Sequence, residues 1–408
     1  MSYSVAMLSV HTSPLDTPGK TKDAGGMNVY MRELAYELAL QHQKIDIFTR
    51  WTNEHTPQIV QVAPGLRVIH IQAGPKTAVA KQDLYQYLPA FVRNLEEFVR
   101  REEGSYDLLH SHYWLSGVAA MELAARWDVP HVTMFHTLGK LKQQANPREP
   151  ESPLRLEMEQ RVIQQADVIV AATAEERMQM IRGCGASSHR VEVVPCGVNL
   201  QLFQPYDAPQ HARERFGLHA DLPILLFAGR LDPFKGPDLL LHAASLMQED
   251  AQVVIAGGSL AGDNDLYHLQ QLADELKISE RVKFLGACPQ PELPLLFSAA
   301  DITVVPSYHE SFGLVAVESL ACGTPVVATR AGGLTTVVRH GETGFLVPRC
   351  PGFFAERLDT LLRDPHLYAQ MCAASRHSVL QYSWMSVAAE ISAIYDLLVT
   401  SASCLVAQ

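Results

Sequence analysis

Arg230 and Lys235 are the two cations whose spacing points most directly to chemistry. They lie in FAGRLDPFKG (227–236), five residues apart and directly after an apolar run. Gly229 and Gly236 keep the backbone open, so both side chains can converge on one small anion of the size of a diphosphate. A guanidinium fork and a compact ammonium suit a leaving group that develops negative charge without a metal. The alternative is a solvated pair on a loop.

Glu310 and Glu318 form the second pattern, in HESFGLVAVES. Their spacing places one carboxylate in a loop, facing a sugar, and the other in the first turns of a helix, where it can reach a ribose hydroxyl. The expected helix start at Phe312, Gly313 and Leu314 offers backbone N–H groups to a phosphate. The alternative is that Glu318 is simply an exposed helix residue.

Gly25 and Gly26 are the third pattern, in TKDAGGMNVYMREL. They precede a segment in which Val29, Leu34 and Leu38 have helical spacing, so they present an open helix N-terminus. This arrangement predicts an anion site. A tight turn that needs glycine for its geometry would give the same sequence.

Metal ligation is not expected. Asp263 and Asp265 form a D-x-D in AGDNDLY, but they follow a glycine-rich loop and are interpreted as turn residues that cap the next helix. His11, His110 and His112 do not have a convincing ligand spacing. Arg230 and Lys235 already supply the positive charge that a metal would bring.

Composition indicates an ordinary globular protein with two domains. The 408 residues are 47% hydrophobic, and the formal net charge is −11 without a long run of Lys or Arg, which argues against a nucleic-acid partner. Seven scattered cysteines are typical of reduced thiols and of a cytoplasmic protein. The N-terminus is interpreted as a first buried strand rather than a signal peptide, and no segment approaches the roughly 20 apolar residues of a membrane span.

Short apolar runs that alternate with amphipathic stretches predict an α/β fold with two doubly wound parallel sheets. The first series, including KIDIFT, LRVIHI and ADVIVAA, defines a domain at 1–200. The second, including PILLFAGR, AQVVIAGG and ADITVVPS, defines a domain at 201–380. We expect a cleft between them. The remaining segment, 381–408, is expected to form a helix that packs back on the first domain, with an apolar face at Val387, Ile391, Ile394 and Leu397.

These motifs together resemble glycosyltransferase family 4, the retaining enzymes of the GT-B fold. The resemblance rests on GGMNVY, HSHYW, PCGVN, GRLDPFKG, the two-Glu motif, ACGTPVVATRAGG and GETGFLV, which span nearly the whole chain. It implies two Rossmann-like domains, the first for the acceptor and the second for a nucleotide-sugar donor, which is UDP-linked. Arg230 and Lys235 would then bind the diphosphate and Glu318 the ribose. The UDP-sugar is a substrate, and no cofactor is implied.

Within the family, the first half is most similar to the mycothiol-pathway transferases that move N-acetylglucosamine to an inositol phosphate. That resemblance implies that the acceptor is held by Asn28, Lys81, Tyr113, Thr137 and Arg155, the last four around its phosphate. HTLG at 136–139 falls between this subgroup and the sucrose-phosphate synthases. The resemblance therefore implies that the acceptor is an inositol phosphate or a sugar phosphate such as fructose 6-phosphate, and that the transferred hexose is N-acetylglucosamine or glucose.

The resemblance also implies a mechanism in which the acceptor hydroxyl attacks on the face that the diphosphate leaves, while a donor phosphate oxygen takes the proton. Glu310 would bond to the sugar rather than act as a nucleophile, and His136 would steady the sugar. The alternative for His136 is a core histidine bonded to a carbonyl. Two other functions stay open: another enzyme on the same fold, such as an epimerase or a phosphorylase, and a non-catalytic sugar-nucleotide sensor. A homo-oligomer is compatible with the sequence.

Overall fold

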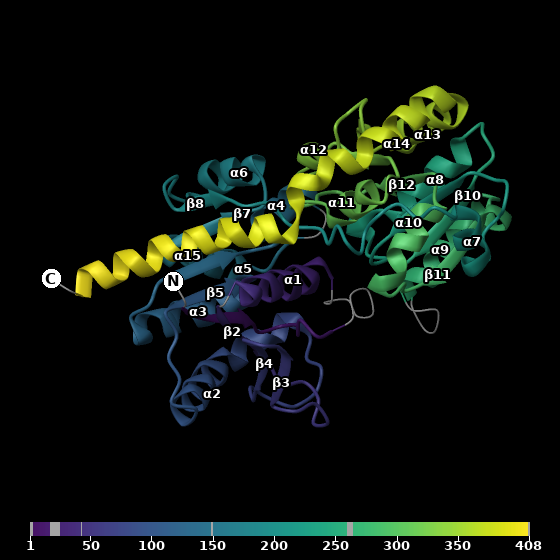
Figure 1. Ribbon diagram of the computed structural model, residues 1–408. Helices are drawn as coiled ribbons and strands as arrows, with labels where there is room; N and C mark the ends of the chain where they lie inside the picture. Colours follow the sequence, from purple (N-terminus) through teal and green to yellow (C-terminus); the bar gives the residue numbers. More distant parts are fainter. Residues whose placement is uncertain (1–2, 17–24, 42, 148–149, 259–263, 407–408) are drawn as a thin grey trace. The chain divides into compact units, whose positions relative to one another are not determined.

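The computed structural model describes residues 3–16, 25–41, 43–147, 150–258 and 264–406. The chain divides into two α/β units, and Figure 1 labels many of their helices and strands. The first comprises Met1–Asp16, Gly26–Pro195 and Trp384–Gln408, and Cys196–Ser383 forms the body of the second. Each unit has a sheet of its own, which confirms the expected class of two doubly wound α/β folds.

The first sheet is almost entirely parallel. Among the described residues it has eight strands in the order β3-β4-β2-β1-β5-β6-β7-β8, and β3 is antiparallel to β4. A strand such as β1 is a continuous buried run because helices cover the sheet. The bounds are β1 Ser4–Ser9, β2 Lys44–Arg50, β3 Ile59–Ala63, β4 Leu66–Ile71, β5 Leu108–His112, β6 His131–Met134, β7 Val168–Ala171 and β8 Val191–Val193.

The strand order of this sheet reverses beside β1. The chain moves outward through β2 and β4 and then returns, so that β5 pairs with β1 on its other side. Functional loops of open α/β sheets gather at the carboxyl ends of the strands at such a reversal. His11 follows β1, and Tyr113 follows β5 directly. Because β1 and β5 are parallel neighbours, His11 and Tyr113 both lie at the carboxyl edge of this sheet.

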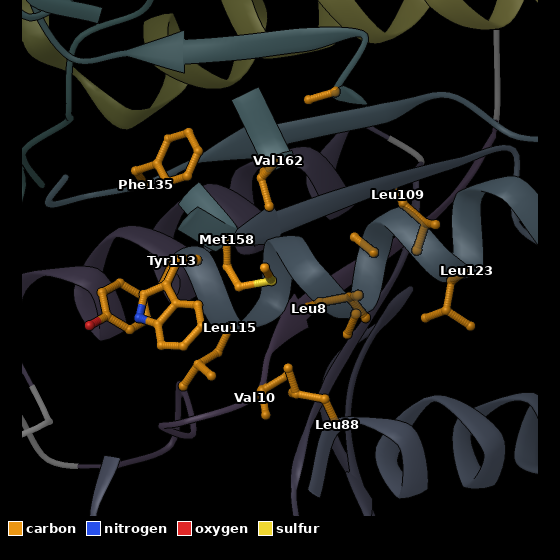
Figure 2. Close-up of a cluster of buried hydrophobic side chains, with 14 of the residues drawn as sticks. Leu8, Val10, Leu88, Leu109, Tyr113, Leu115, Leu123, Phe135, Met158 and Val162 are labelled. Carbon is orange, nitrogen blue, oxygen red and sulfur yellow. The ribbon is translucent and has the colours of Figure 1, made fainter. Parts of the chain in front are cut away.

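Helices pack against this sheet and bury its apolar side chains. Figure 2 shows part of the resulting core, where Leu8 of β1, Leu109 of β5 and Val162 of α5 belong to one cluster of buried side chains. The bounds are α1 Gly26–Leu40, η1 Lys81–Tyr87, α2 Leu88–Arg101, α3 Trp114–Trp127, α4 Gly139–Ala145, α5 Pro153–Gln165, α6 Ala174–Cys184 and α15 Trp384–Val406.

Helix α15 completes the first unit, although it comes from the far end of the chain. It packs against α1, and its Val387, Ile391 and Tyr395 are fully buried. These residues recur every four positions and so share one face. The expected apolar face is wrong at Leu397, which is 71% exposed, because Tyr395 lies on the buried side instead. No helix in the described part of the chain is both long and apolar enough to span a membrane.

The second sheet is parallel throughout its described strands, in the order β11-β10-β9-β12-β13-β14. The order reverses beside β9, since the chain moves outward through β10 and β11 and then places β12 on the other side of β9. The loops after β9 and β12 are thereby neighbours. The bounds are β9 Ile224–Ala228, β10 Gln252–Ala256, β11 Val282–Gly286, β12 Ile302–Val305, β13 Val326–Thr329 and β14 Gly344–Val347.

Helices of the second unit enclose a separate core. Leu240 of α8, Ile255 of β10 and Phe354 of α13 belong to it and are fully buried. The bounds are α7 Pro209–Phe216, η2 Pro233–Lys235, α8 Pro237–Leu246, α9 Asn264–Glu275, η3 Ser279–Arg281, η4 Gln290–Glu292, α10 Leu293–Ala299, α11 Leu314–Ala321, α12 Leu334–Val337, α13 Pro351–Arg363, α14 Pro365–Val379 and η5 Leu380–Tyr382.

Candidate functional site

Lys235 and Glu310 form an ion pair at the carboxyl end of the second sheet. Lys235 Nζ lies 2.7 Å from Glu310 Oε1, and Ser307 Oγ donates to the same oxygen at 2.8 Å. Burial would by itself raise the pKa of Glu310, but the ammonium of Lys235 and these two hydrogen bonds hold that pKa below its usual range. Glu310 is therefore a charged, oriented acceptor at neutral pH.

The two loops that carry this pair are joined through their backbones. Tyr308 N donates to Phe234 O at 2.9 Å. Gly236 has a φ of +75°, and a Cβ built there would clash with Pro306 O. A larger residue could not follow Lys235 without moving one loop away from the other. The glycine thus sets the separation of the loops on which Lys235 and Glu310 lie.

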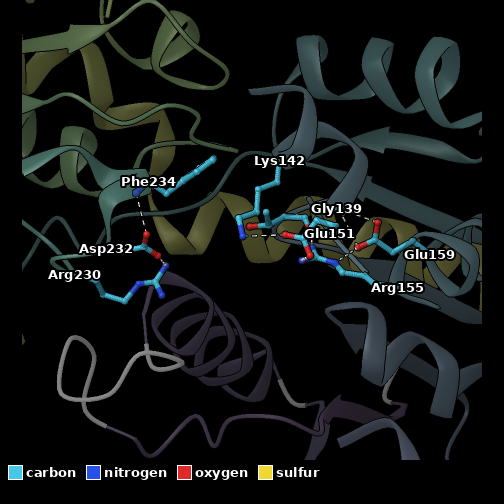
Figure 3. A network of polar contacts seen from close by, with 9 residues as sticks. Gly139, Lys142, Glu151, Arg155, Glu159, Arg230, Asp232 and Phe234 are labelled. Carbon is cyan, nitrogen blue, oxygen red and sulfur yellow. Dashed lines mark hydrogen bonds and ion pairs between the residues drawn. The ribbon is translucent and has the colours of Figure 1, made fainter. Parts of the chain in front are cut away.

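Arg230 lies on the same loop as Lys235, directly after β9 (Figure 3). Its Nη2 is 3.8 Å from Asp232 Oδ2, which is long for an ion pair, and its side chain is 34% exposed. Asp232 is held separately, because its Oδ1 accepts a hydrogen bond from Phe234 N at 2.9 Å. Arg230 and Lys235 thus belong to one loop, and the ammonium of Lys235 pairs with Glu310 of another loop.

Helix α11 follows the loop that carries Glu310. Gly313 caps it with a φ of +103°, Leu314 is its first residue, and the side chain of Phe312 packs edge-on against Tyr382 at 5.3 Å between ring centroids. Glu318, on the second turn, is 6% exposed. The alternative of an exposed helix carboxylate is therefore wrong for Glu318. A buried carboxylate needs a hydrogen-bonding role to offset its desolvation.

In the first unit, Arg155 of α5 is the centre of a buried polar network (Figure 3). Its Nε donates to Glu159 Oε1 at 2.7 Å, its Nη1 to Glu151 Oε2 at 2.9 Å and its Nη2 to Thr137 O at 2.7 Å. Glu151 also pairs with Lys142 at 2.9 Å. The guanidinium is thus fully oriented, and two carboxylates on its own helix or just before it balance its charge.

Lys81 lies near this network across the ring of Tyr113, as a third cation beside Arg155 and Lys142. The ring lies 5.1 Å from Arg155 Cζ and 5.6 Å from Lys81 Nζ, and it packs on His11 with 4.4 Å between centroids. Its φ of +74° is unusual for a tyrosine and belongs to the turn from β5 into α3. Lys81, Tyr113, Thr137 and Arg155 are therefore brought together by elements far apart in the sequence.

Asn28 makes contacts of a different kind. It is fully buried on α1, and its Nδ2 donates to Thr12 Oγ1 at 2.8 Å and to Ser13 O at 2.6 Å. These bonds tie α1 to the loop after β1. Gly26 is the first residue of α1 and Gly25 precedes it, so the glycine pair lies at a helix N-terminus. The segment 17–24, which precedes this pair, lies outside the described residues.

The sequence matches two family models, one over most of the first half of the chain and one over most of the second half. Glycosyltransferase Family 4 matches residues 24–202, and Glycosyl transferases group 1 matches residues 210–378. The D-inositol 3-phosphate glycosyltransferase of Streptomyces bingchenggensis is 43% identical over 403 residues, which cover 96% of this chain and 88% of that protein. This chain belongs to glycosyltransferase family 4. It is an enzyme of the glycosyltransferase class, as the motifs in both halves predict.

Solved structures agree with this assignment and with the GT-B fold. The sucrose-phosphate synthase of Thermosynechococcus elongatus has a TM-score of 0.92 at 33% identity and covers 98% of this chain and 100% of that one. Anabaena HepE, solved in complex with UDP and glucose, has a TM-score of 0.78 at 20% identity and covers 97% and 100% of the two chains. At 20% identity, the similarity to HepE supports the fold only.

His136 of this glycosyltransferase lies after β6 with a φ of +58°. Burial lowers its pKa to about 3, so the imidazole is neutral at physiological pH. Its Nε2 lies 2.9 Å from His112 Nδ1, and the ring packs edge-on against Tyr30 at 5.1 Å. Nε2 of His136 is thus bonded to a second histidine.

No group of three or more metal-ligating side chains occurs among the described residues of the transferase. Asp265 lies in the first turn of α9, and Asp263 lies outside the described residues. His110 and His112 neighbour each other at 4.3 Å between ring centroids. Their contacts are with other rings rather than with carboxylates.

Sequence reasoning missed two residues that support the transferase's site. Arg349, after β14, donates from Nε to Pro306 O at 3.1 Å, and its Cζ lies 3.5 Å from the centroid of the Tyr308 ring. It therefore holds the loop that carries Glu310. His112 is the second, and its spacing of two from His110 on a strand was the available signal, since alternate strand residues face the same side. Arg349 gave no comparable signal, because its partners lie in loops distant in sequence.

Proposed function

We propose that this glycosyltransferase moves a hexose from a UDP-sugar to a phosphorylated acceptor with retention of the anomeric configuration. The observation that carries the proposal is the oriented cluster of Arg155 and Lys81 around Tyr113 in the first unit. A phosphate dianion in a buried position needs cations and hydrogen-bond donors around it, and a neutral sugar acceptor does not. The cluster therefore supports a phosphorylated acceptor.

The donor is proposed to bind in the second unit. Arg230 and Lys235 lie on the loop after β9, at the reversal of strand order where α/β sheets hold nucleotides. Their charges would stabilise a departing diphosphate. Glu318, buried on α11, would accept a hydrogen bond from the ribose, and the backbone at Gly313 and Leu314 would face a phosphate. No cofactor or metal is needed for this arrangement.

Glu310 is proposed to hold the sugar rather than to attack it. Its carboxylate is already paired with Lys235 and bonded by Ser307, both at Oε1. Such pairing lowers the basicity and therefore the nucleophilicity of the group. A double displacement would need a free carboxylate near the anomeric carbon. We therefore favour attack by the acceptor hydroxyl on the same face that the diphosphate leaves, with a donor phosphate oxygen as the base.

An inositol phosphate is the first choice of acceptor. The curated relative that is 43% identical bears the name D-inositol 3-phosphate glycosyltransferase, and it matches the chain nearly end to end. A sugar phosphate such as fructose 6-phosphate is the second choice, because the sucrose-phosphate synthase structure is 33% identical and has a TM-score of 0.92. Both acceptors carry a phosphate, so the Arg155 cluster serves either.

The test is a matrix of two donors and two acceptors. UDP-glucose and UDP-N-acetylglucosamine are each incubated with 1L-inositol 1-phosphate or with fructose 6-phosphate, and UDP release is measured. Release with one phosphorylated acceptor, and an α-linked product from the α-linked donor by NMR, is the expected result. Equal release with unphosphorylated inositol or fructose would contradict the role of the cluster, and tight UDP binding without any release would point to a sensor.

A further inference from the structure

A row of buried rings joins α15 to His136 within the first unit. His110 and His112 lie two apart on β5 and share a face, with 4.3 Å between their ring centroids. At one end, His110 Nδ1 is 2.5 Å from Tyr395 OH of α15. At the other, His112 Nδ1 is 2.9 Å from His136 Nε2. The row therefore ends on the histidine that we expect to contact the transferred sugar.

His112 is enclosed on all sides. Its side chain is 0% exposed, and its Nε2 is buried without a hydrogen-bond partner in the described part of the chain. Burial and the neighbouring His110 and His136 keep the pKa of His112 well below its ordinary value. The ring is therefore neutral and carries one proton, either on Nδ1 or on Nε2.

The two ring nitrogens of His112 differ in the free-energy cost of carrying the proton, because their surroundings differ. A proton on Nε2 would create a buried N–H donor without an acceptor, which costs about 1–3 kcal/mol. A bare lone pair at the same place is tolerated better, because orphaned N–H groups are the rarer defect in protein interiors. The proton therefore belongs on Nδ1, from which His112 donates to His136 Nε2.

We infer that His112 is a positioning residue that fixes His136 as the Nδ1-protonated tautomer, so that His136 presents an N–H donor to an oxygen of the transferred sugar. The neutral His136 ring has its Nε2 engaged as an acceptor, and its single proton must then lie on Nδ1. The inference rests on the proposed function for the identity of the ligand. The tautomer itself follows from the contacts of the first unit alone.

The C-terminal helix holds the orientation of this pair. Tyr30 of α1 packs edge-on against His136 at 5.1 Å and lies 5.7 Å from His112, and Trp384 at the start of α15 packs on Tyr30 at 5.4 Å. The His136 ring is thus restrained by a hydrogen bond from one side and by an aromatic edge from another. A donor fixed in this way loses little entropy when it binds a sugar oxygen.

The direct test uses the wild-type protein without ligand. Histidine labelled with ¹⁵N in the imidazole is observed by long-range ¹H–¹⁵N correlation at pH 7.5, and His136 is assigned by its loss in His136→Asn. We expect an unprotonated Nε2 and a protonated Nδ1 for His136. The opposite tautomer, or an even mixture of both, would overturn the inference, whatever substrate the enzyme uses.

The functional test compares two replacements of His112. His112→Phe keeps a ring but removes the donor, and we expect kcat to fall on the order of 10-fold, the effect of one hydrogen bond. His112→Asn places an amide donor near the position of Nδ1, and it is expected to recover most of that loss and to restore the Nδ1–H signal of His136. The affinity for UDP, which the second unit is proposed to bind, should be unchanged in both.

A matched control is His131→Phe. His131 is also a buried histidine of the first sheet, and it bonds to Ser111 Oγ at 2.7 Å rather than to His136. We expect this change to leave the His136 signals unaltered. Equal kcat for wild type and a folded His112→Phe would refute the positioning role. Absence of any sugar transfer by the wild type would refute the proposed function instead, while the tautomer measurement would still decide the inference.

Discussion

At the residue scale, Lys235 has two roles. Its ammonium pairs with the carboxylate of Glu310 in the free enzyme, and it is proposed to bind the diphosphate of the donor. The 2.7 Å contact with Glu310 orients the ammonium before any ligand binds. A charge that is already in place does not need to reorganise when negative charge develops on a leaving group. Under the proposed function, the ion pair therefore holds the ammonium ready for the departing nucleotide.

Lys235→Ala is expected to lower kcat roughly 100-fold or more, the usual size of effect when a preorganised electrostatic contact to the transition state is lost. The measurement is the initial rate of UDP release with the acceptor that the wild type uses. Because the change also leaves Glu310 without its counter-ion, the double variant Lys235→Ala/Glu310→Gln should regain thermal stability but not activity. A single variant with a near-normal rate would mean that the diphosphate binds elsewhere.

Arg155→Ala is expected to raise the KM for the phosphorylated acceptor by about 10- to 100-fold, since hydrogen bonds to charged groups contribute about 1.5–3 kcal/mol. The KM for the UDP-sugar should change little. Arg161→Ala is the matched control, because Arg161 lies on the same helix, pairs with Glu157 and has a side chain that is 58% exposed. Equal increases in both KM values would remove Arg155 from acceptor binding.

At the scale of elements, strand order and loop geometry determine which residues meet. The loops after β9 and β12 adjoin because β12 pairs with β9, although β10 and β11 come between them in sequence. Gly236 then sets how closely those loops approach. Arg349 adds a stacking contact on Tyr308 from the loop after β14. The site in the second unit is thus a property of three loops together.

Gly236→Ala is expected to weaken UDP binding about 10-fold or more, because a left-handed conformation costs an alanine about 1–2 kcal/mol and the new methyl group would force the loops apart. Isothermal titration with UDP measures the effect. Gly352→Ala is the control, because a Cβ at that position on α13 would meet nothing within 4 Å. Unchanged affinity in Gly236→Ala would mean that the approach of the two loops is unimportant for the nucleotide.

At the scale of the whole molecule, buried histidines make stability depend on pH. Burial lowers the pKa of both His110 and His131 to about 3, and both side chains lie in the first unit. Their pKa in the unfolded chain is about 6.5. Protons are therefore taken up on unfolding between these two values, and the stability that is complete above pH 6.5 is lost as the pH falls toward 3.

Acidification from pH 6.5 to pH 5.5 is expected to lower the free energy of unfolding of the first unit by about 1 kcal/mol for each histidine that burial keeps neutral, and so by about 2 kcal/mol or more, since His136 adds to the contributions of His110 and His131. All four tryptophans of the chain, Trp51, Trp114, Trp127 and Trp384, belong to that unit. Tryptophan fluorescence during urea unfolding therefore reports on it selectively. The free energy of unfolding should not change between pH 7.5 and pH 8.5. If it also stayed constant down to pH 5.5, the buried histidines would not be neutral in the folded state.

Much of the fold could be predicted from local patterns. Continuous apolar runs indicated buried parallel strands because such strands are covered on both faces, and FAGRLDPFKG placed Arg230 and Lys235 on one loop because they are close in sequence. The buried position of Glu318 and the exposed position of Leu397 could not be predicted in the same way. Which side of a helix is covered depends on the element that packs against it.

Sequence alone determined the two α/β folds, the family and the types of residue at each strand end, since these depend on composition, periodicity and short motifs. Tertiary structure alone decided the pairing of Lys235 with Glu310 and the path from Tyr395 through His110 and His112 to His136. Residues 75 and 285 positions apart meet in these contacts. Strand order and the return of α15 bring them together, and both result from packing over the whole unit rather than from any local pattern.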